Sequence, residues 1–249
     1  MSGPIQVVLA GASGRTGREV GRAILSADDM TLAGAIGNTQ VGMRLDSLWP
    51  GQSGDLEITA ALPWVEGNPV VLVDFTEPKS SYSRVLEAID RGWHVVVGTT
   101  GFTSTERQSI RDRVQERGVG AALIANFSLG AWLIERLVEE AARYFSEAEL
   151  VEAHHPHKKD RPSGTAKRLA ERLAHQWGRD LEQIPVHAIR LPGMVAHQEV
   201  LFGAPGQVLT IRHDVHDRSA YTEGVLRGIR RIEGFAGQLI EDPGPIMMD

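Results

Sequence analysis

The chain has 249 residues, a formal net charge of −6 at pH 7 and no cysteine. A net negative charge without a basic block argues against a nucleic-acid partner, and the lack of cysteine excludes disulfides, thiolate metal sites and a cysteine nucleophile. No apolar run approaches the roughly 18 residues that span a membrane, and the first residues lack the basic segment of a signal peptide. We therefore expect a cytoplasmic enzyme with no membrane partner and with room for two domains.

The chain begins with an expected strand, a glycine-rich turn and a helix. Residues 6–10 are apolar, residues 11–17 have the sequence Gly-Ala-Ser-Gly-Arg-Thr-Gly, and a helical pattern continues to about Leu25. A dinucleotide-binding turn has this order, because its glycines let the backbone approach a pyrophosphate that the helix amides hold. The spacing is GxxGxxG instead of GxGxxG, so an ordinary strand-to-helix turn remains the alternative.

Expected strands and helices continue to alternate through the first half of the chain. The strands are at residues 30–36, 70–75, 94–97 and 120–124. The helices are at 78–90, after a Thr103/Glu106 capping box, and from the segment 125–128 to about 145. Such alternation predicts a doubly wound, Rossmann-like parallel sheet. Ligands bind beyond the carboxyl ends of its strands, where residues 11–17, 74–76 and 98–100 fall. Each segment alone indicates only a turn, but together they favour a cofactor site.

The pattern changes after Phe145. A strand at 149–153 and a helix at 166–177 precede strands at 186–191, 199–202 and 207–212, with no helix between these strands. This pattern predicts an α+β domain with an open, mixed or antiparallel sheet. We therefore expect two domains. Residues 1–126 form a dinucleotide-binding domain that 218–249 completes, and 127–217 form a substrate-binding and oligomerisation domain.

A segment rich in acid/base groups follows the strand at 149–153. Residues 154–166 have the sequence His-His-Pro-His-Lys-Lys-Asp-Arg-Pro-Ser-Gly-Thr-Ala. Imidazoles move protons near neutral pH, and ammonium groups and free helix amides hold carboxylates. A solvated basic loop is one alternative, and a metal site of His154, His155 and His157 is another. No nearby carboxylate is clearly placed as a further ligand, so we expect no metal.

With these motifs, the chain resembles the dihydrodipicolinate reductase (4-hydroxy-tetrahydrodipicolinate reductase) family. The most specific element is the segment from Glu152 to Ala166, and the glycine turn supports it less specifically. Further matching segments are residues 74–76, 98–102, 125–128, 190–193, 197–199 and 211–214. Together they cover nearly the whole chain in unbroken order.

The resemblance implies an NAD(P)H-dependent oxidoreductase of lysine and diaminopimelate biosynthesis. It would reduce a cyclic, unsaturated dicarboxylate to tetrahydrodipicolinate, as a homotetramer built through the sheet of the second domain. His154 matches the proton donor/acceptor of the family and Lys158 its second proton-donating group. His155, Gly164 and Thr165 match its substrate contacts. NADPH or NADH is expected to bind at the residues Gly11, Ala12, Ser13, Gly14, Arg15, Thr16, Gly98, Thr99, Thr100, Ala125, Asn126 and Phe127.

Two positions depart from the family pattern. Arg161 stands where a small residue is usual. Gly37 and Asn38 follow the second strand, where an Asp or Glu normally binds the adenosine ribose and repels a 2′-phosphate. We therefore expect weak discrimination against NADPH, whose phosphate Arg15 or Arg44 could meet.

Two rival functions share the glycine turn, and the residues exclude the second of them. A non-catalytic dinucleotide sensor would keep the glycine turn but would not need the His/Lys cluster. A short-chain dehydrogenase-like reductase needs a tyrosine with a lysine four residues later, and Tyr82, Tyr144 and Tyr221 lack that lysine. Arg212 could face substrate, but a charge pair between strands explains it equally well. We assign no chemistry to the other histidines, which are His187, His197, His213 and His216.

Overall fold

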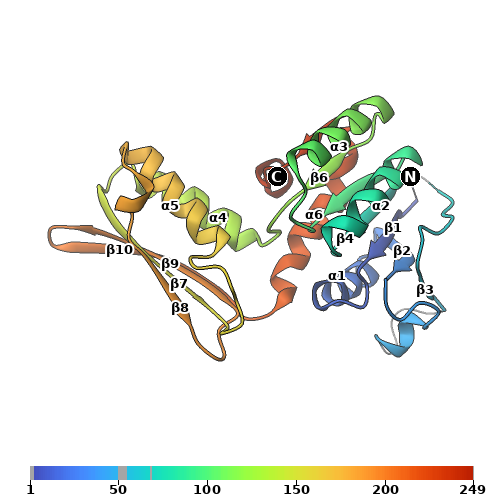
Figure 1. Ribbon diagram of the computed structural model, residues 1–249, viewed down its shortest axis with the longest axis horizontal. Coiled ribbons are helices and arrows are strands. Elements are labelled where there is room, and N and C mark those ends of the chain that lie inside the picture. The colour runs from blue at the N-terminus through green and yellow to red at the C-terminus, as the bar shows by residue number, and fades with distance from the viewer. Residues whose placement is uncertain (1–2, 50–54, 68, 249) are drawn as a thin grey trace. The chain divides into compact units, whose positions relative to one another are not determined.

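The computed structural model describes residues 3–49, 55–67 and 69–248 (Figure 1). The chain divides into two compact units, which are treated separately below. Unit 1 consists of Met1–Ser128 and Tyr221–Asp249, and unit 2 of Leu129–Ala220. Within the described ranges, no helix combines the length and the apolar character needed to cross a membrane.

Unit 1 is built on a seven-stranded sheet whose neighbouring strands all run parallel. In sheet order the strands are β11 (Leu239–Ile240), β6 (Ala121–Leu123), β5 (His94–Val97), β4 (Val70–Asp74), β1 (Ile5–Ala10), β2 (Met30–Ile36) and β3 (Ile58–Thr59). The central strands are almost continuously apolar because helices bury both faces of the sheet. The strand order reverses between β1 and β4, which is where doubly wound sheets bind their ligands. The predicted parallel sheet is confirmed.

Helices cover the two faces of this sheet. α2 (Pro78–Asp90) and α3 (Ser104–Arg117) pack together on one face, and α1 (Arg15–Leu25) packs with α6 (Thr222–Arg231) on the other. The predicted capping box at the start of α3 is present, with Thr103 and Glu106 bonding each other's backbone N–H. The remaining short helices are η1 (Leu45–Ser47), η3 (Arg218–Tyr221), η4 (Ile232–Phe235) and α7 (Gly244–Met247).

Unit 2 is a four-stranded sheet with helices on one face, and the predicted α+β unit with a mixed sheet is confirmed. In sheet order its strands are β10 (Gln207–Val215), β9 (Ala196–Ala204), β7 (Glu147–His154) and β8 (Val186–Arg190). β8 runs parallel to β7, whereas β9 is antiparallel to both β7 and β10. Its helices are α4 (Leu129–Ala141), α5 (Gly164–Trp177) and η2 (Leu181–Gln183). The apolar faces of α4 and α5 form one core with β7 and β9.

Several boundaries in unit 2 differ from the predicted ones. β9 and β10 are longer than predicted, because polar ends such as His197 and Asp214 stay in the ladder and bond each other across it. β7 likewise starts two residues early and includes His154. α4 starts at Leu129, directly after a turn in which the Asn126 side chain accepts a hydrogen bond from the Ser128 N–H, and it ends at Ala141 instead of about Phe145.

Candidate active site

β7 places a carboxylate and an imidazole side by side at its carboxyl end. Side chains alternate along a strand, so Glu152 and His154 lie on the same face as the core residues Ala148 and Leu150. Glu152 is fully buried and His154 is 7% exposed. Burial of two titratable groups is costly unless they are hydrogen-bonded, so their partners define the site.

Both carboxylate oxygens of Glu152 are fully engaged. Arg190, which lies opposite His154 on β8, donates from Nη1 to Oε2 at 2.9 Å and from Nη2 to Oε1 at 2.8 Å. The Ser163 N–H donates to Oε1 at 3.3 Å, and His154 Nδ1 shares a short hydrogen bond with Oε2. Arg190 also donates to the carbonyl of Asp160 at 2.7 Å. The result is a charged network that connects two strands with the loop after β7.

Opposing effects set the pKa of each member of the pair. Burial would raise the pKa of Glu152, but hydrogen bonds from Arg190 and His154 outweigh it and hold that pKa below its usual value. For His154, burial lowers the pKa, and the raising effect of Glu152 does not fully offset it. The charges of Lys158 and Arg190 lower it further. The site therefore combines an ionised carboxylate with an imidazole that gives up its proton readily.

The predicted substrate contacts lie at the start of α5. Ser163 caps this helix by accepting the Ala166 N–H on its hydroxyl at 3.3 Å, and Gln198 of β9 donates to the same hydroxyl at 3.2 Å. The first N–H groups of a helix have no partner within the helix. Those of Gly164 and Thr165 therefore stand at the positive end of the helix dipole, where a carboxylate is favoured.

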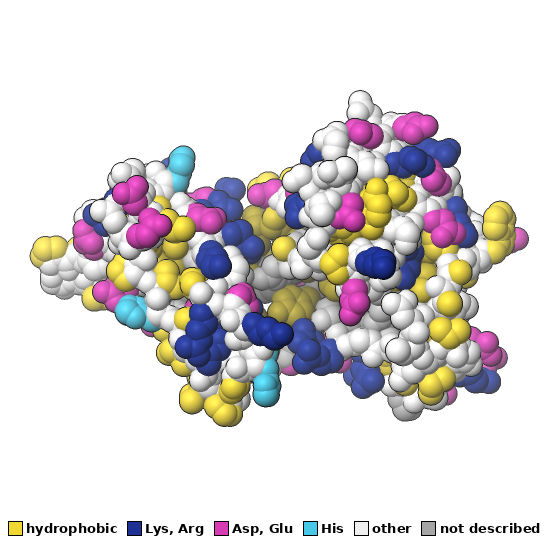
Figure 2. Space-filling view, in the orientation of Figure 1, with side chains coloured by type: hydrophobic (Ala, Val, Ile, Leu, Met, Phe, Trp, Pro, Cys, Tyr) yellow, Lys and Arg dark blue, Asp and Glu magenta, His cyan; other side chains and the backbone are white. Residues whose placement is uncertain are grey.

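The loop between β7 and α5 brings further cations to the site. Lys158 folds back through a turn in which its N–H donates to the His155 carbonyl at 3.1 Å, and its ammonium group pairs with Asp160 at 2.9 Å. The ring centroids of His155 and His157 are 6.2 Å apart. Figure 2 shows Lys, Arg and His side chains gathered on this part of unit 2. In the described part of the chain, no group of three or more His, Asp or Glu side chains could hold a metal ion.

In unit 1, the glycine turn forms a cradle at the start of α1, with no room for a side chain at Gly11 and Gly17. Gly11 has a left-handed φ of +87°, and a Cβ there would lie 2.7 Å from the Phe75 carbonyl oxygen. A Cβ at Gly17 would lie 2.1 Å from the Gly11 carbonyl oxygen. The helix is capped by Gly14, which offers no side-chain acceptor to the first amides. These features fit a pyrophosphate, because bare backbone can approach it and free helix amides can hold it.

A buried ion pair braces two of the predicted cofactor segments. Asp74 at the end of β4 pairs with Arg84 of α2 at 2.5 Å. Its other oxygen accepts from the Thr76 hydroxyl at 2.6 Å, the Thr76 N–H at 2.9 Å and the Thr99 hydroxyl at 3.0 Å. Thr99 thus uses its hydroxyl within the protein, and the Gly98 N–H donates to the Asp74 carbonyl at 2.9 Å, so both residues are held against β4.

The position directly after β2, Gly37, bears on the choice between NADH and NADPH. A Cβ at Gly37, directly after β2, would lie 3.7 Å from Ser13 Oγ in the glycine turn. A side chain at this position would therefore point toward the cradle. Arg44 pairs with Asp55, whereas Arg15 is exposed at the first position of α1.

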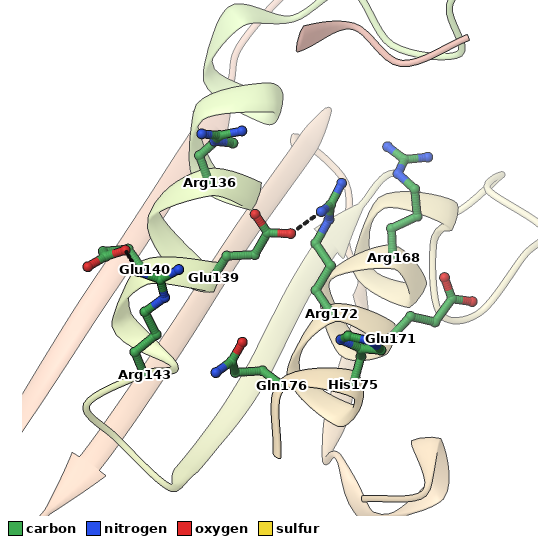
Figure 3. Close-up of a pocket in the computed structure, with 9 residues that line it drawn as sticks. All are labelled: Arg136, Glu139, Glu140, Arg143, Arg168, Glu171, Arg172, His175 and Gln176. Atoms are coloured by element: carbon green, nitrogen blue, oxygen red, sulfur yellow. Dashed lines mark hydrogen bonds and ion pairs between the residues drawn. The ribbon is translucent and has the colours of Figure 1, made fainter. Parts of the chain in front are cut away.

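A hollow of about 780 Å³ lies along α4 and α5, apart from the residues described above (Figure 3). Charged residues of both helices line it, but they compensate one another. Arg172 pairs with Glu139 and, at 3.0 Å, with Glu135, and Arg168 pairs with Glu135 at 3.1 Å. Four arginines and three glutamates line the hollow, so most of their charge is compensated by neighbouring side chains.

The supporting residues of the site were not predicted from the sequence. Glu152 and Arg190 belong to the matching segments but received no role, and Asp74 was noted only as a strand end. The two-residue spacing of Glu152 and His154 on a strand was the available signal, because it puts both side chains on one face. Arg212 pairs with Glu199 of β9 at 3.2 Å and with Asp214 at 2.8 Å, which agrees with the charge-pair alternative.

Comparisons with known proteins agree over both units. Residues 5–127 match the family described as dihydrodipicolinate reductase, N-terminus, and residues 130–241 match its C-terminus. The 4-hydroxy-tetrahydrodipicolinate reductase of Thermosynechococcus vestitus is 39% identical, with 93% of each chain covered. That of Moorella thermoacetica is 39% identical over 95% of this chain and 96% of its own. A dipicolinate-bound dihydrodipicolinate reductase from a Paenisporosarcina species has a TM-score of 0.82 at 29% identity, covering 96% of this chain and 97% of that one.

Proposed function

The chain belongs to the dihydrodipicolinate reductase family, and on that premise we propose that it reduces 4-hydroxy-tetrahydrodipicolinate to tetrahydrodipicolinate with NAD(P)H, in lysine and diaminopimelate biosynthesis. One observation carries the proposal beyond the family match. The buried Glu152–His154 pair lies beside the N-terminus of α5, so an acid/base group and a carboxylate site are adjacent. A cyclic dicarboxylate that must be protonated during its reduction requires both.

His154 is the proton donor in this proposal and Lys158 is the second one. Reduction of the conjugated ring leaves electron density that an acid near neutral pH can protonate. The ammonium of Lys158 stabilises the developing negative charge from the same loop. One substrate carboxylate lies on the amides of Gly164 and Thr165, and His155 contacts the substrate from the loop.

The nicotinamide cofactor supplies the hydride when it is bound. In unit 1, Gly11 to Thr16 hold its pyrophosphate with backbone amides at the start of α1. Backbone groups of Gly98, Thr99 and Thr100, with Ala125, Asn126 and Phe127, form the other part of its site. The glycine at position 37 leaves the adenosine 2′ position without a negative charge, so we propose that NADPH serves at least as well as NADH.

We also propose a homotetramer in the cytoplasm. The face of the unit 2 sheet that α4 and α5 leave uncovered exposes apolar side chains, among them Ile189, which is 43% exposed. The family resemblance implies assembly through this sheet. Light scattering of the purified protein measures the mass directly, and a monomer would contradict this part.

The test is a coupled assay in which dihydrodipicolinate synthase supplies the unstable substrate. We expect NAD(P)H oxidation by the wild type and a loss of turnover of roughly 10²–10⁴-fold in His154→Gln, the usual range for a general acid. NAD(P)H affinity should stay nearly unchanged in that variant. A wild type that binds NAD(P)H without oxidising it would instead support the non-catalytic sensor.

A further inference from the structure

We propose that Glu152, locked in place by Arg190, is the positioning residue of this site. It keeps the proton of His154 on Nδ1 and leaves Nε2 as the nitrogen that exchanges a proton with substrate. It also ties the imidazole to the loop and to the helix N-terminus that receive the substrate. The catalytic consequence rests on the proposed function, whereas the proton position on His154 does not.

The first argument is the donor and acceptor count around Glu152. An ionised carboxylate only accepts hydrogen bonds, and the two arms of Arg190 donate to its two oxygens. His154 Nδ1 is bonded to Oε2, so Nδ1 must carry a proton whether the ring is neutral or charged. The hydrogen bond at one ring nitrogen thus determines which form of the neutral imidazole is present.

The second argument is the role of Arg190. Its side chain is only 3% exposed, and it lies against a carboxylate that is fully buried. Without this guanidinium the buried carboxylate would be more basic and would compete for the imidazole proton. With it, Glu152 stays ionised and orients the ring without taking its proton, as the orienting carboxylate of a Ser-His-Asp triad does.

Apart from Glu152 and Arg190, the charged groups near His154 belong to the loop between β7 and α5. Lys158 and Arg190 lower the pKa of the imidazole, and Glu152 raises it. Asp160 pairs with Lys158 and so keeps that ammonium close to the loop backbone. On the other side, Ser163 and Gln198 contribute only uncharged groups. Within the described residues, Glu152 is therefore the carboxylate in direct contact with the His154 imidazole.

The third argument is that the hydrogen-bond network of Glu152 connects His154 with the loop and with the start of α5. Through Arg190, the carboxylate reaches the carbonyl of Asp160 in the loop. Through the Ser163 N–H it reaches the residue that caps α5. One buried side chain thus fixes the acid on β7 and the start of α5, whose amides receive the substrate carboxylate. Such supporting contacts orient the groups that meet the ligand.

The direct test is ¹⁵N NMR of histidine-labelled protein in the absence of substrate and cofactor. The His154 resonances are identified by their loss in His154→Gln. We expect a protonated Nδ1 and an unprotonated Nε2 in the wild type at neutral pH. In Glu152→Gln, whose amide can donate to Nδ1, the neutral ring should carry its proton on Nε2 in a sizeable fraction of molecules. A neutral His154 ring that carries its proton on Nε2 in the wild type would overturn the proposal.

The matched control is Glu171→Gln, the same substitution on α5. Glu171 is exposed, lies along the hollow beside α4 and is outside the network. This variant should leave the His154 resonances and turnover as in the wild type. If Glu152→Gln does not fold, Arg190→Lys provides the second variant, because lysine cannot bridge both carboxylate oxygens.

The kinetic readout separates positioning from general damage. Glu152→Gln should lower kcat by about 10- to 100-fold, as loss of an orienting partner does, with little change in the KM for NAD(P)H. Because Glu152 raises the pKa of His154, its removal should also shift the alkaline limb of the kcat profile to lower pH. An unchanged kcat and pH profile would overturn the catalytic role. If the wild type fails to reduce the substrate at all, the proposed function fails while the NMR result stands.

Discussion

The ring of Phe75 lies directly against Gly98, so that a Cβ at position 98 would be 2.1 Å from Phe75 Cε1. On its other side, Phe75 meets the ring of Phe127 edge-on, with 5.9 Å between the centroids. These three residues follow β4, β5 and β6. These two contacts therefore link the segments that follow three adjacent strands of unit 1, at the expected cofactor site.

Gly98→Ala should consequently weaken NAD(P)H binding. The added methyl group must displace the Phe75 ring, and overpacking of this kind costs about 1–3 kcal/mol of stability. Urea unfolding measures the stability, and fluorescence titration measures the affinity for the cofactor. Gly234→Ala in η4 is the control, since a Cβ there meets nothing within 4 Å. Wild-type affinity in Gly98→Ala would show that Phe75 does not set the shape of the site.

Asp74→Asn should strongly destabilise unit 1, although the two side chains are almost the same size. Asp74 is fully buried and Arg84 is 8% exposed, so the variant leaves an uncompensated buried guanidinium. Removal of one partner of such a pair costs about 3–5 kcal/mol. Urea unfolding gives the loss, and Asp90→Asn is the control because the partners of Asp90, Arg113 and Arg117, are exposed. Equal losses in the two variants would contradict the structural role of the Asp74 pair.

The parts of the fold that could be predicted from the sequence are those with a regular pattern of apolar residues. The alternation of apolar strands with helices specified the doubly wound sheet, and the endpoints of α2 and β5 were predicted to the residue. The two-residue strands β3 and β11 were missed, because two residues are too few to show a period. The Glu152–Arg190 pair was missed for another reason. Its partners are 38 positions apart, and only the parallel pairing of β7 with β8 brings them together.

Binding of pyridine-2,6-dicarboxylate should be linked to proton uptake by His154. In the free protein, burial lowers the pKa of this imidazole. A dianion beside it favours the charged ring and raises that pKa in the complex. The complex therefore binds more protons than the free protein between the two pKa values, and affinity should rise as the pH falls through that window.

Calorimetry in buffers of different ionisation enthalpy counts the protons taken up on binding. His154→Gln is the control, and it should bind the same ligand with less proton uptake and a flatter pH dependence. His175→Gln, a change on the exposed side of α5, should behave as the wild type. Equal uptake by the wild type and His154→Gln would assign the proton to another group, such as His155.

The choice of cofactor should depend on position 37. In Gly37→Asp the new carboxylate starts from a Cβ that would lie 3.7 Å from Ser13 Oγ. The same Cβ would meet Ile58 Cγ2 and the Thr39 carbonyl oxygen at 3.0 Å, so a small local shift is required. The carboxylate supplies an acceptor for the ribose hydroxyls of NADH and repels the 2′-phosphate of NADPH. We expect a shift of about 1–3 kcal/mol toward NADH.

Gly37→Ala separates this charge effect from the steric one, because it adds the same Cβ without a carboxylate. The values of kcat/KM for NADH and NADPH are compared at fixed ionic strength, since the repulsion of the phosphate is screened by salt. Gly37→Ala should leave the ratio of the two values near that of the wild type, whereas Gly37→Asp should change it. Arg15→Ala should lower the value for NADPH alone if this exposed residue meets the 2′-phosphate. A strong NADH preference in the wild type, or an unaltered ratio in Gly37→Asp, would mean that other residues distinguish the two cofactors.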